Sequence, residues 1–326
     1  MKGLLSLRLS GRLLQATPVI IFGVLMIVFG SLSTRFLTLE NLCIILVQSS
    51  WLIVVALGMN IALLTAGVDL SVGAAMYLAA VTVGLALGRY SPGVSLLGAM
   101  AVGALFGAIN GLLIVRVGLL AFIVTLATTF IGRGLALFLS GTKIVYASPE
   151  VAGLGRTAFW GVPLPLCLAA GATAVVWIIM KRTPFGPYVR SIGADPEGAR
   201  RVGVPLGMVL WGVYALCGAF AGLGGFVSLS QASSASGAFG LNAEFLAIAA
   251  AVLGGTSLFG GRGSVRAPVI GAVLIMAVQN GLAMINANPY AYPVITGAVI
   301  FVAALLDSVR LRLARRWERR PIRPIV

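Results

Sequence analysis

The sequence predicts an all-α membrane protein that crosses the bilayer about ten times. Three observations support this fold class. The 326 residues are 60% hydrophobic and only 10% charged, whereas soluble domains average about 45–50% apolar and about 25% charged residues. Apolar runs close to the roughly 20 residues that a spanning helix needs follow one another along most of the chain. The basic residues lie between these runs instead of along one soluble face.

Ten apolar runs are the candidate spans. The run at 74–88 is the shortest and follows a glycine-bounded polar segment, so we expect a broken or half helix there. The 42 glycines, many beside Ala or Ser within the runs, predict close helix packing through small residues. We expect residues 1–326 to form a single transmembrane domain. The spans cover residues 17–33, 42–65, 74–88, 94–115, 118–139, 164–180, 207–230, 243–260, 267–285 and 291–307.

The net charge of +15 is concentrated in three segments. By the positive-inside rule these segments are cytoplasmic, and ten crossings place them on the same side. They are an N-terminal segment (1–16), a central loop (181–206) and a basic tail (308–326). The basicity therefore indicates membrane topology and argues against a nucleic-acid partner. Their cations are Lys2, Arg8 and Arg12, then Lys181, Arg182, Arg190, Arg200 and Arg201, and last the seven arginines from 310 to 323.

Short segments in the two halves of the chain resemble one another. Gly98-Ala99 and Asn110-Gly111-Leu112 correspond to Gly271-Ala272 and Asn280-Gly281-Leu282. Transporters are often built from such repeats, so a pseudo-repeat of two five-helix halves is one interpretation. A chance match of common dipeptides is the other.

The composition argues against an enzyme or a metal protein. The chain has no His, and its three Cys lack the spacing of a metal site, so we expect no catalytic residues and no metal ligands. The glycine-rich stretch from 254 to 263 lacks the Gly-Lys-Ser/Thr ending of a phosphate-binding loop, so we expect no cofactor on this chain. A tight structural turn is the better interpretation. Its glycines are Gly254, Gly255, Gly260, Gly261 and Gly263.

The central basic loop carries start and stop signals for a short helix over residues 196–202. An N-cap residue, a proline at the first position and an acid favour the start, while two arginines and a glycine favour the end. In chain order these residues are Asp195, Pro196, Glu197, Arg200, Arg201 and Gly203.

Ala199 and Val202 fall three residues apart on one face of this helix and would form a small apolar knob. A helix of two turns is marginal alone in water and gains order by docking onto another surface. An ordinary capped loop helix is the alternative interpretation.

A few polar residues within the apolar runs are candidates for a translocation path or gate. Asp69 and Ser71 lie in the segment Gly67–Gly73, and an ionised carboxylate at the bilayer centre costs about 2.5–3.5 kcal/mol or more. Asp69 would either cap a helix that starts at Leu70 or hydrogen-bond a hydroxylated solute. Asn60 and Glu244 are the further candidates.

Taken together, these segments resemble the permease family of ABC sugar importers that includes the ribose, xylose and arabinose permeases. The resemblance covers nearly the whole chain in order. It is carried by Phe36–Leu42 with Leu57–Met59, Gly67–Gly73, Thr125–Ala127 with Arg133-Gly134, Gly193–Glu197 through Gly203, and Leu253–Ser257 with Gly260–Ser264.

The resemblance implies a permease dimer in the bacterial inner membrane, with both termini cytoplasmic. It would receive a monosaccharide, a pentose or hexose, from a periplasmic binding protein and move it by alternating access. A separate ABC ATPase, often with two fused nucleotide-binding halves, would bind ATP and Mg and drive the movement. Gly193 and residues 195–203 would then be the element that couples the permease to this ATPase.

Several residues depart from the family's usual pattern, and these departures leave a pair of two homologous permeases open as well as a homodimer. The departures are Asn60, Ala74, Gly198, Arg201 and the stretch Arg266–Pro268. The alternative functions are a proton-coupled transporter that uses Asp69 or Glu244, and an ABC permease for a nucleoside or an amino acid. A membrane-embedded enzyme is disfavoured by the eight acidic residues and the missing His.

Overall fold

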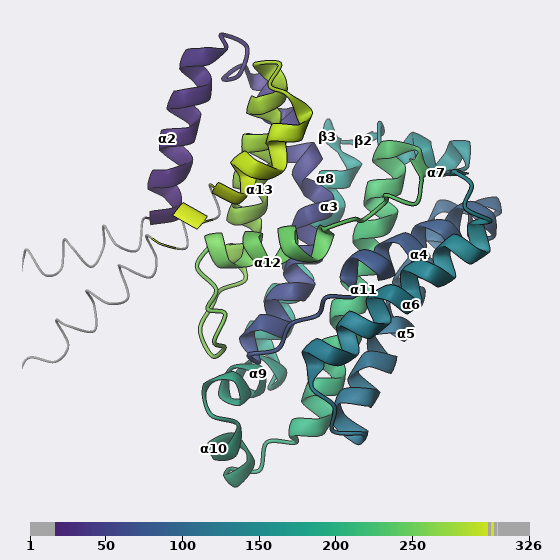
Figure 1. Ribbon diagram of the computed structural model, residues 1–326, viewed down its shortest axis with the longest axis vertical. Helices are drawn as coiled ribbons and strands as arrows, with labels where there is room; N and C mark the ends of the chain where they lie inside the picture. Colours follow the sequence, from purple (N-terminus) through teal and green to yellow (C-terminus); the bar gives the residue numbers. More distant parts are fainter. Residues whose placement is uncertain (1–16, 299–300, 303–304, 306–326) are drawn as a thin grey trace, which may run out of the picture. The chain divides into compact units, whose positions relative to one another are not determined.

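The computed structural model describes residues 17–298, 301, 302 and 305, and regular structure in this part of the chain is mainly helical (Figure 1). The helices are α2 (Thr17–Leu32), α3 (Leu39–Leu64), α4 (Val72–Leu85), η1 (Leu87–Arg89), α5 (Pro92–Arg116), α6 (Ala121–Ser140), α7 (Pro149–Leu154), α8 (Leu164–Arg182), α9 (Phe185–Ala194), α10 (Pro196–Arg201), α11 (Leu206–Ala232), α12 (Ala243–Leu253), α13 (Arg266–Met284) and η2 (Pro289–Ala291). Strands of two residues each are β1 (Val145–Tyr146), β2 (Ala158–Phe159), β3 (Val162–Pro163) and β4 (Ser234–Ala235).

Six helices of the described residues are long and apolar enough to cross a membrane, namely α3, α5, α6, α8, α11 and α13. Shorter apolar helices accompany them at Phe22–Leu32, Val72–Leu85 and Ala243–Leu253. The chain is therefore a helical, polytopic membrane protein, as predicted. The predicted N-terminal segment 1–16, the basic tail 308–326 and part of the tenth run lie outside the described residues.

Two of the predicted spans are short helices. The 14 residues of α4 reach about 21 Å at 1.5 Å per residue, less than the roughly 30 Å hydrocarbon core, so the expectation of a short helix there is confirmed. The predicted run 243–260 was wrong in its length, because α12 has 11 residues and ends at Leu253. Gly255 follows with φ +104°, a conformation that cannot continue a right-handed helix.

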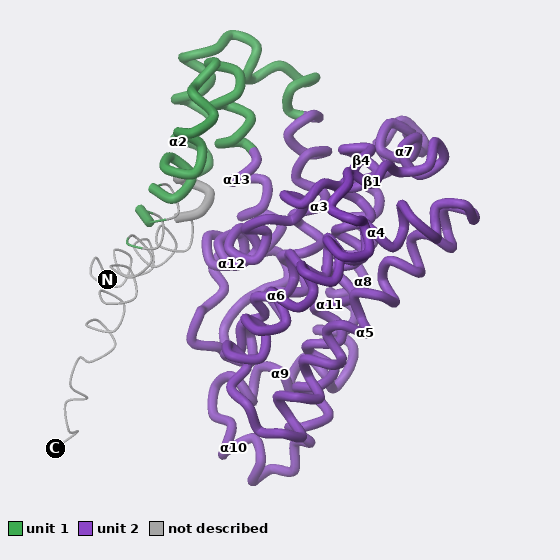
Figure 2. The backbone as a smooth tube through the Cα atoms, turned by 45° about the vertical axis from the view of Figure 1, so that its right-hand side comes forward, with its two compact units in different colours: residues 1–42, 277–326 green, residues 43–276 purple. Residues whose placement is uncertain are grey.

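The chain divides into two compact units, residues 1–42 with 277–326 and residues 43–276 (Figure 2). In the first unit, the rings of Phe29 and Phe36 lie 5.3 Å apart. Gly281 approaches Phe29 so closely that a Cβ at position 281 would meet the ring at 2.5 Å. The Asn41 amide donates to the Phe36 carbonyl (2.8 Å) and to Asn280 Oδ1 (3.0 Å), so both packing and the Asn41 hydrogen bonds hold the described part of this unit together.

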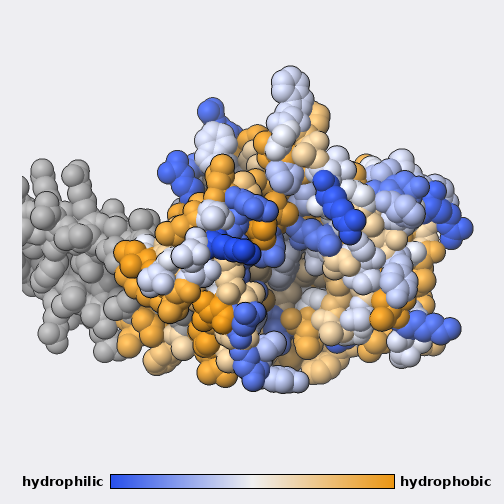
Figure 3. Space-filling view, turned by 90° about the horizontal axis from the view of Figure 1, so that it is seen from above, coloured by the Kyte–Doolittle hydropathy of each residue, from blue (hydrophilic) through white to orange (hydrophobic). Residues whose placement is uncertain are grey.

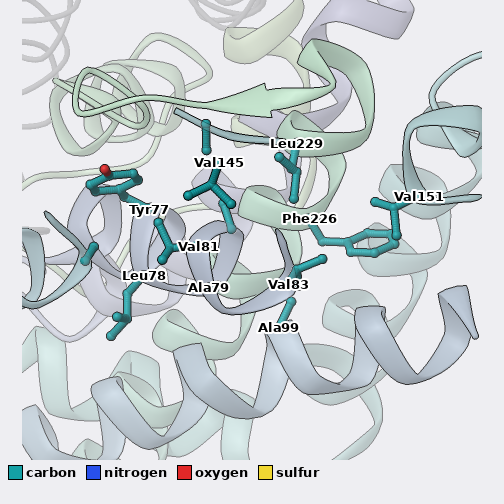
Figure 4. Close-up of a cluster of buried hydrophobic side chains, with 13 residues drawn as sticks. Tyr77, Leu78, Ala79, Val81, Val83, Ala99, Val145, Val151, Phe226 and Leu229 are labelled. Atoms are coloured by element: carbon teal, nitrogen blue, oxygen red, sulfur yellow. The ribbon is translucent and has the colours of Figure 1, made fainter. Parts of the chain in front are cut away.

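In the second unit, α4 lies at the centre of the packing. Eleven of its 14 residues are buried, and it contacts α5, α6 and α11. One core cluster joins its side chains to those of α11, α5 and the strand β1 (Figure 4). Tyr77, Val81 and Val83 come from α4, with Phe226 and Leu229 from α11.

The α5–α11 crossing confirms the predicted packing through small residues. A Cβ at Gly103 would meet the carbonyl of Gly218, and a Cβ at Gly107 would meet the carbonyl of Tyr214. Gly222 faces the carbonyl of Ala99 in the same way. The two backbones therefore touch directly, which is how helices pack in lipid, where no hydrophobic effect drives them together.

Short strands and α7 fill the loop regions after α6 and after α11. Strand β1 pairs antiparallel with β4, and β2 pairs antiparallel with β3. The β2–β3 hairpin turns through Trp160 and Gly161, which have φ +54° and +79°. The two positive φ values at its centre match the turns whose twist suits a two-residue hairpin.

Apolar side chains are exposed on several helices, as expected of a surface that faces lipid. On α6, Phe130 and Phe138 are 72% and 82% exposed. Apolar and hydrophilic side chains both appear on the face that Figure 3 presents. Exposed apolar helix faces beside polar ends are typical of a protein embedded in a bilayer.

Candidate functional site

The segment between α3 and α4 folds around Asp69. Its Oδ1 atom accepts hydrogen bonds from the Ser71 amide (2.9 Å) and from the Ser71 hydroxyl (2.6 Å). The expectation that Asp69 caps a helix starting at Leu70 was wrong, because α4 begins at Val72 and Ser71 stands at its N-cap. Asp69 instead forms a local turn with the residue two positions on, a geometry that short acidic side chains favour.

Two neighbouring helices hold this segment in place. The Asn110 amide of α5 donates to the Ser71 hydroxyl (2.8 Å), and the Thr129 hydroxyl of α6 donates to the Leu70 carbonyl (2.8 Å). Asp69 has no exposed surface, and Asp69 Oδ2 and Asn110 Oδ1 have no hydrogen-bond partner among the described residues. The segment is therefore a fixed, buried polar cluster with spare acceptor capacity.

Glu244 lies at the start of α12, beside the first turn of α4. A Cβ at Gly73 would meet Glu244 Oε2 at 2.5 Å, and it would also meet the Gly240 carbonyl. Glu244 is 9% exposed, and its Oε2 atom has no hydrogen-bond partner among the described residues. The N-terminal ends of two short helices thus meet here, each with a buried carboxylate close by.

Arg133 of α6 fixes the segment that leads into α12. Its guanidinium donates to the carbonyls of Gly237 (2.9 Å) and Phe239 (3.4 Å) and lies 5.8 Å from the centre of the Tyr77 ring. Sequence reasoning did not assign roles to Arg133, Asn110 or Thr129. The sequence did offer a signal for these three residues, because polar residues within apolar helices are rare and usually have a hydrogen-bond partner.

Asn60 lies elsewhere and has a different set of contacts. Its Oδ1 atom accepts from the Thr256 hydroxyl (2.6 Å), and its amide donates to the Ser264 carbonyl (3.4 Å). Asn60 is completely buried. It therefore ties α3 to the glycine-rich turn, whereas Asp69, Ser71 and Glu244 lie around the starts of α4 and α12.

The glycine-rich stretch forms a turn between α12 and α13, as predicted. Gly255, Gly260 and Gly261 have φ values of +104°, +82° and +69°, which favour glycine. Gly254 lies against the Ala267 carbonyl of α13, and a Cβ at Gly263 would meet Thr256 Oγ1 at 2.8 Å. Each of these positions needs glycine for backbone conformation or for close approach.

Helix α10 occupies the predicted position in the central basic loop, next to α9 (Figure 1). It spans Pro196–Arg201, one residue less than expected. At its end the Gly203 amide bonds the Arg200 carbonyl (3.1 Å) and the Val204 amide bonds the Ala199 carbonyl (3.1 Å). Gly203 has φ +82°. This pair of bonds is the Schellman motif, so the predicted stop signal is confirmed.

Two details of the expected α10 were wrong. Asp195 stands at the N-cap, but its carboxylate accepts no capping hydrogen bond in the described part of the chain. Ala199 and Val202 do not form a shared knob, because Ala199 is 3% exposed and packs inward while Val202 is 79% exposed. The exposed positions around the helix are Asp195, Pro196, Glu197 and Arg200–Gly203.

The described residues thus form a buried polar cluster at the start of α4, a glycine-rich turn bonded to α3, and a short exposed helix, α10. The chain matches the family described as branched-chain amino acid transport system / permease component over residues 41–304. The chain belongs to this family of permease components.

The relatives include named sugar permeases. The D-allose transport system permease protein of Escherichia coli strain K12 is 35% identical over 293 residues, which cover 89% of this chain and 90% of the relative. The ribose import permease protein of the same strain is 33% identical over 307 residues, covering 91% and 94%. Its galactose/methyl galactoside import permease protein is 36% identical over 300 residues, covering 84% and 88%. No solved structure gives a significant match to the chain.

Proposed function

We propose that this protein is the permease subunit of an ABC importer for a monosaccharide, a pentose or a hexose. The observation that carries the proposal is the similarity, along most of the chain, to permeases named for allose, ribose, fructose and galactose. These solutes share a small ring or chain with several hydroxyl groups. The protein itself is non-catalytic, and ATP with Mg is bound and hydrolysed on a partner ATPase.

The proposed setting is the bacterial inner membrane, with ten spans in two five-helix halves and both termini cytoplasmic. The distribution of cations supports this orientation. In this topology the loop that carries α9 and α10 faces the cytoplasm, together with the glycine-rich turn. The β1–β4 and β2–β3 strand pairs face the periplasm.

The proposed partners are an ABC ATPase with two fused nucleotide-binding halves, a periplasmic sugar-binding protein and a second permease, either another copy or a homologue. The residues from Asp195 to Gly203 form the part of the coupling element that seats in the ATPase, and Gly193, at the end of α9, joins this part to the rest of the permease. Its exposed cations, Arg200 and Arg201, and the exposed apolar Val202 support this role, because a short helix of this kind gains order on docking.

The proposed gate for the solute lies around Asp69, Ser71 and Glu244. Asp69 and Glu244 each keep one carboxylate oxygen without a partner among the described residues, and sugar hydroxyls are hydrogen-bond donors. Asn60 does not line this gate; its contribution is to hold the glycine-rich turn against α3. The ATPase drives alternating access by binding one conformation of the permease more tightly than the other.

The test is uptake of labelled ribose, allose, fructose and galactose by cells that carry the protein with its candidate binding protein and ATPase. We expect uptake of at least one sugar, and we expect the double substitution Glu197→Ala/Arg200→Ala to reduce it strongly while membrane insertion stays normal. Lys181→Ala removes an exposed cation from the last turn of α8, outside the coupling element, and serves as the control. Uptake that is unaffected by the double substitution would contradict the assigned coupling element.

A further inference from the structure

We infer that a glycine junction transmits movement of the coupling element to the buried Asp69 segment. The junction consists of Gly193, Gly260 and Gly261 with Leu64 and Ala66. It joins the last turn of α9, the glycine-rich turn and the end of α3. The inference rests on the proposed function, because it requires an ATPase that moves α10.

Three backbones meet at the junction without side chains between them. The Gly261 amide donates to the Leu64 carbonyl (3.0 Å). A Cβ at Gly193 would meet that same carbonyl and would lie 2.6 Å from the Gly261 nitrogen. A Cβ at Gly260 would lie 2.7 Å from the Gly193 carbonyl oxygen and 2.8 Å from the Ala66 nitrogen. Because closely packed backbones cannot yield as side chains do, a shift of α9 displaces both neighbours.

On one side of the junction, α9 and α10 are packed together and should move as one unit. Only Asp195 separates the two helices, and they contact one another. Val189 and Ile192 of α9 and Ala199 of α10 are buried. A force on the exposed face of α10 therefore reaches the last turn of α9, where Gly193 lies.

On the other side, the turn and α3 are bonded into one piece. The Asn60 side chain accepts from Thr256 (2.6 Å) and donates to the Ser264 carbonyl (3.4 Å). These bonds lie on either side of the Gly261–Leu64 bond along the turn. The turn therefore follows the end of α3 when α9 moves.

The chain leaves the junction directly into the Asp69 segment. Ala66 has φ +60°, an uncommon conformation for a residue other than glycine, and Gly67 approaches the Tyr214 hydroxyl. Asp69 and Ser71 follow within five residues and are bonded to one another and to Asn110 of α5. A displacement of Leu64 and Ala66 must bend this segment or shift the helices that it holds.

The glycine at position 193 is explained by close approach alone. Its φ is not positive, and it lies within α9, where alanine would stabilise the helix more than glycine. Gly193→Ala is therefore compatible with the conformation of α9, but its methyl group forces the three backbones of the junction apart. Gly171→Ala is the matched control, because Gly171 also lies within a helix and a Cβ there would meet no atom within 4 Å.

The experiment compares these variants with the wild type in the complete complex, reconstituted in proteoliposomes with the ATPase and the binding protein. We expect Gly193→Ala to co-purify with the ATPase and to hydrolyse ATP, but to transport at least tenfold less sugar per ATP hydrolysed. Gly171→Ala should keep the wild-type ratio. A wild-type ratio in Gly193→Ala would overturn the inference, and so would loss of co-purification, which would assign Gly193 to docking alone.

If Gly193→Ala fails to accumulate, a measurement on the wild-type protein tests the role of the junction instead. Amide hydrogen exchange is followed in the wild-type permease with and without the ATPase. We expect exchange to change in residues 64–67 and 257–263 as well as in 193–203, whereas a change confined to 193–203 would overturn the inference. A wild type that neither binds the ATPase nor takes up sugar counts against the proposed function. A wild type that does both without the distant change counts against the junction only.

Discussion

Replacing Asp69 separates its structural role from a role of its charge. In Asp69→Ala, the amide and the hydroxyl of Ser71 lose their shared acceptor, and Ser71 is 1% exposed, so water does not replace the lost bonds. In Asp69→Asn, the amide oxygen can keep both bonds, and only the charge and the second acceptor oxygen are lost. The two variants therefore differ mainly in the hydrogen bonds to Ser71.

The contacts set the expected magnitudes. A buried donor left without its acceptor costs about 1–3 kcal/mol, so the loss of two on the same residue lowers the stability of Asp69→Ala by about 2–6 kcal/mol. Hydrogen bonds to a charged acceptor exceed neutral ones by about 1 kcal/mol, but burial disfavours the charged form, so Asp69→Asn should lose at most about 1–2 kcal/mol. We expect Asp69→Asn to insert normally and to retain most of the uptake.

The assay is thermal unfolding of the purified protein in detergent, combined with sugar uptake. We expect a clearly lower apparent midpoint for Asp69→Ala than for Asp69→Asn. Equal destabilisation of the two variants would refute the role of the Ser71 bonds. An Asp69→Asn protein that is stable but inactive would show that the charge itself takes part in transport.

Three further substitutions test other contacts. Thr256→Val leaves the buried Asn60 oxygen without its donor and should lower the stability measured by thermal unfolding by about 1–3 kcal/mol. Thr256→Ser keeps a hydroxyl and should lower it less, and equal losses in the two variants would argue against this hydrogen bond. Gly218→Val drives a branched side chain into the backbone of α5, so this variant should be lost from the membrane fraction. The control Gly134→Ala has open space around its Cβ and should accumulate normally. Arg133→Gln removes the guanidinium donors that fix the segment before α12. The backbone amide hydrogens of that segment should then exchange about tenfold faster, equivalent to about 1.4 kcal/mol, and unchanged exchange would contradict this role of Arg133.

Local signals in the sequence predicted much of the fold. The apolar runs identified the helices, because a spanning helix has a characteristic length and composition. The glycine-bounded polar segment correctly indicated that α4 is short. Proline and glycine at positions 196 and 203 correctly marked the ends of α10, because both residues act through backbone conformation that is local to the chain.

The contacts of the candidate site could not be predicted in the same way. The partner of Ser71 lies 39 residues away in Asn110, and the partner of Asn60 lies 196 residues away in Thr256. Which helices bring these groups together depends on tertiary packing, which a single sequence does not specify. The same reason explains why Asn60 was grouped with Asp69 and why Ala199 was expected on an exposed face.

The most direct test of the central claim is the energy source of uptake. Proteoliposomes that contain the permease and the ATPase are supplied with the binding protein and labelled sugar outside, and with ATP either inside or absent. We expect accumulation that requires ATP and persists when an uncoupler dissipates the proton gradient. Accumulation that proceeds without ATP and collapses with the proton gradient would contradict it and would make Asp69 and Glu244 candidates for a proton site.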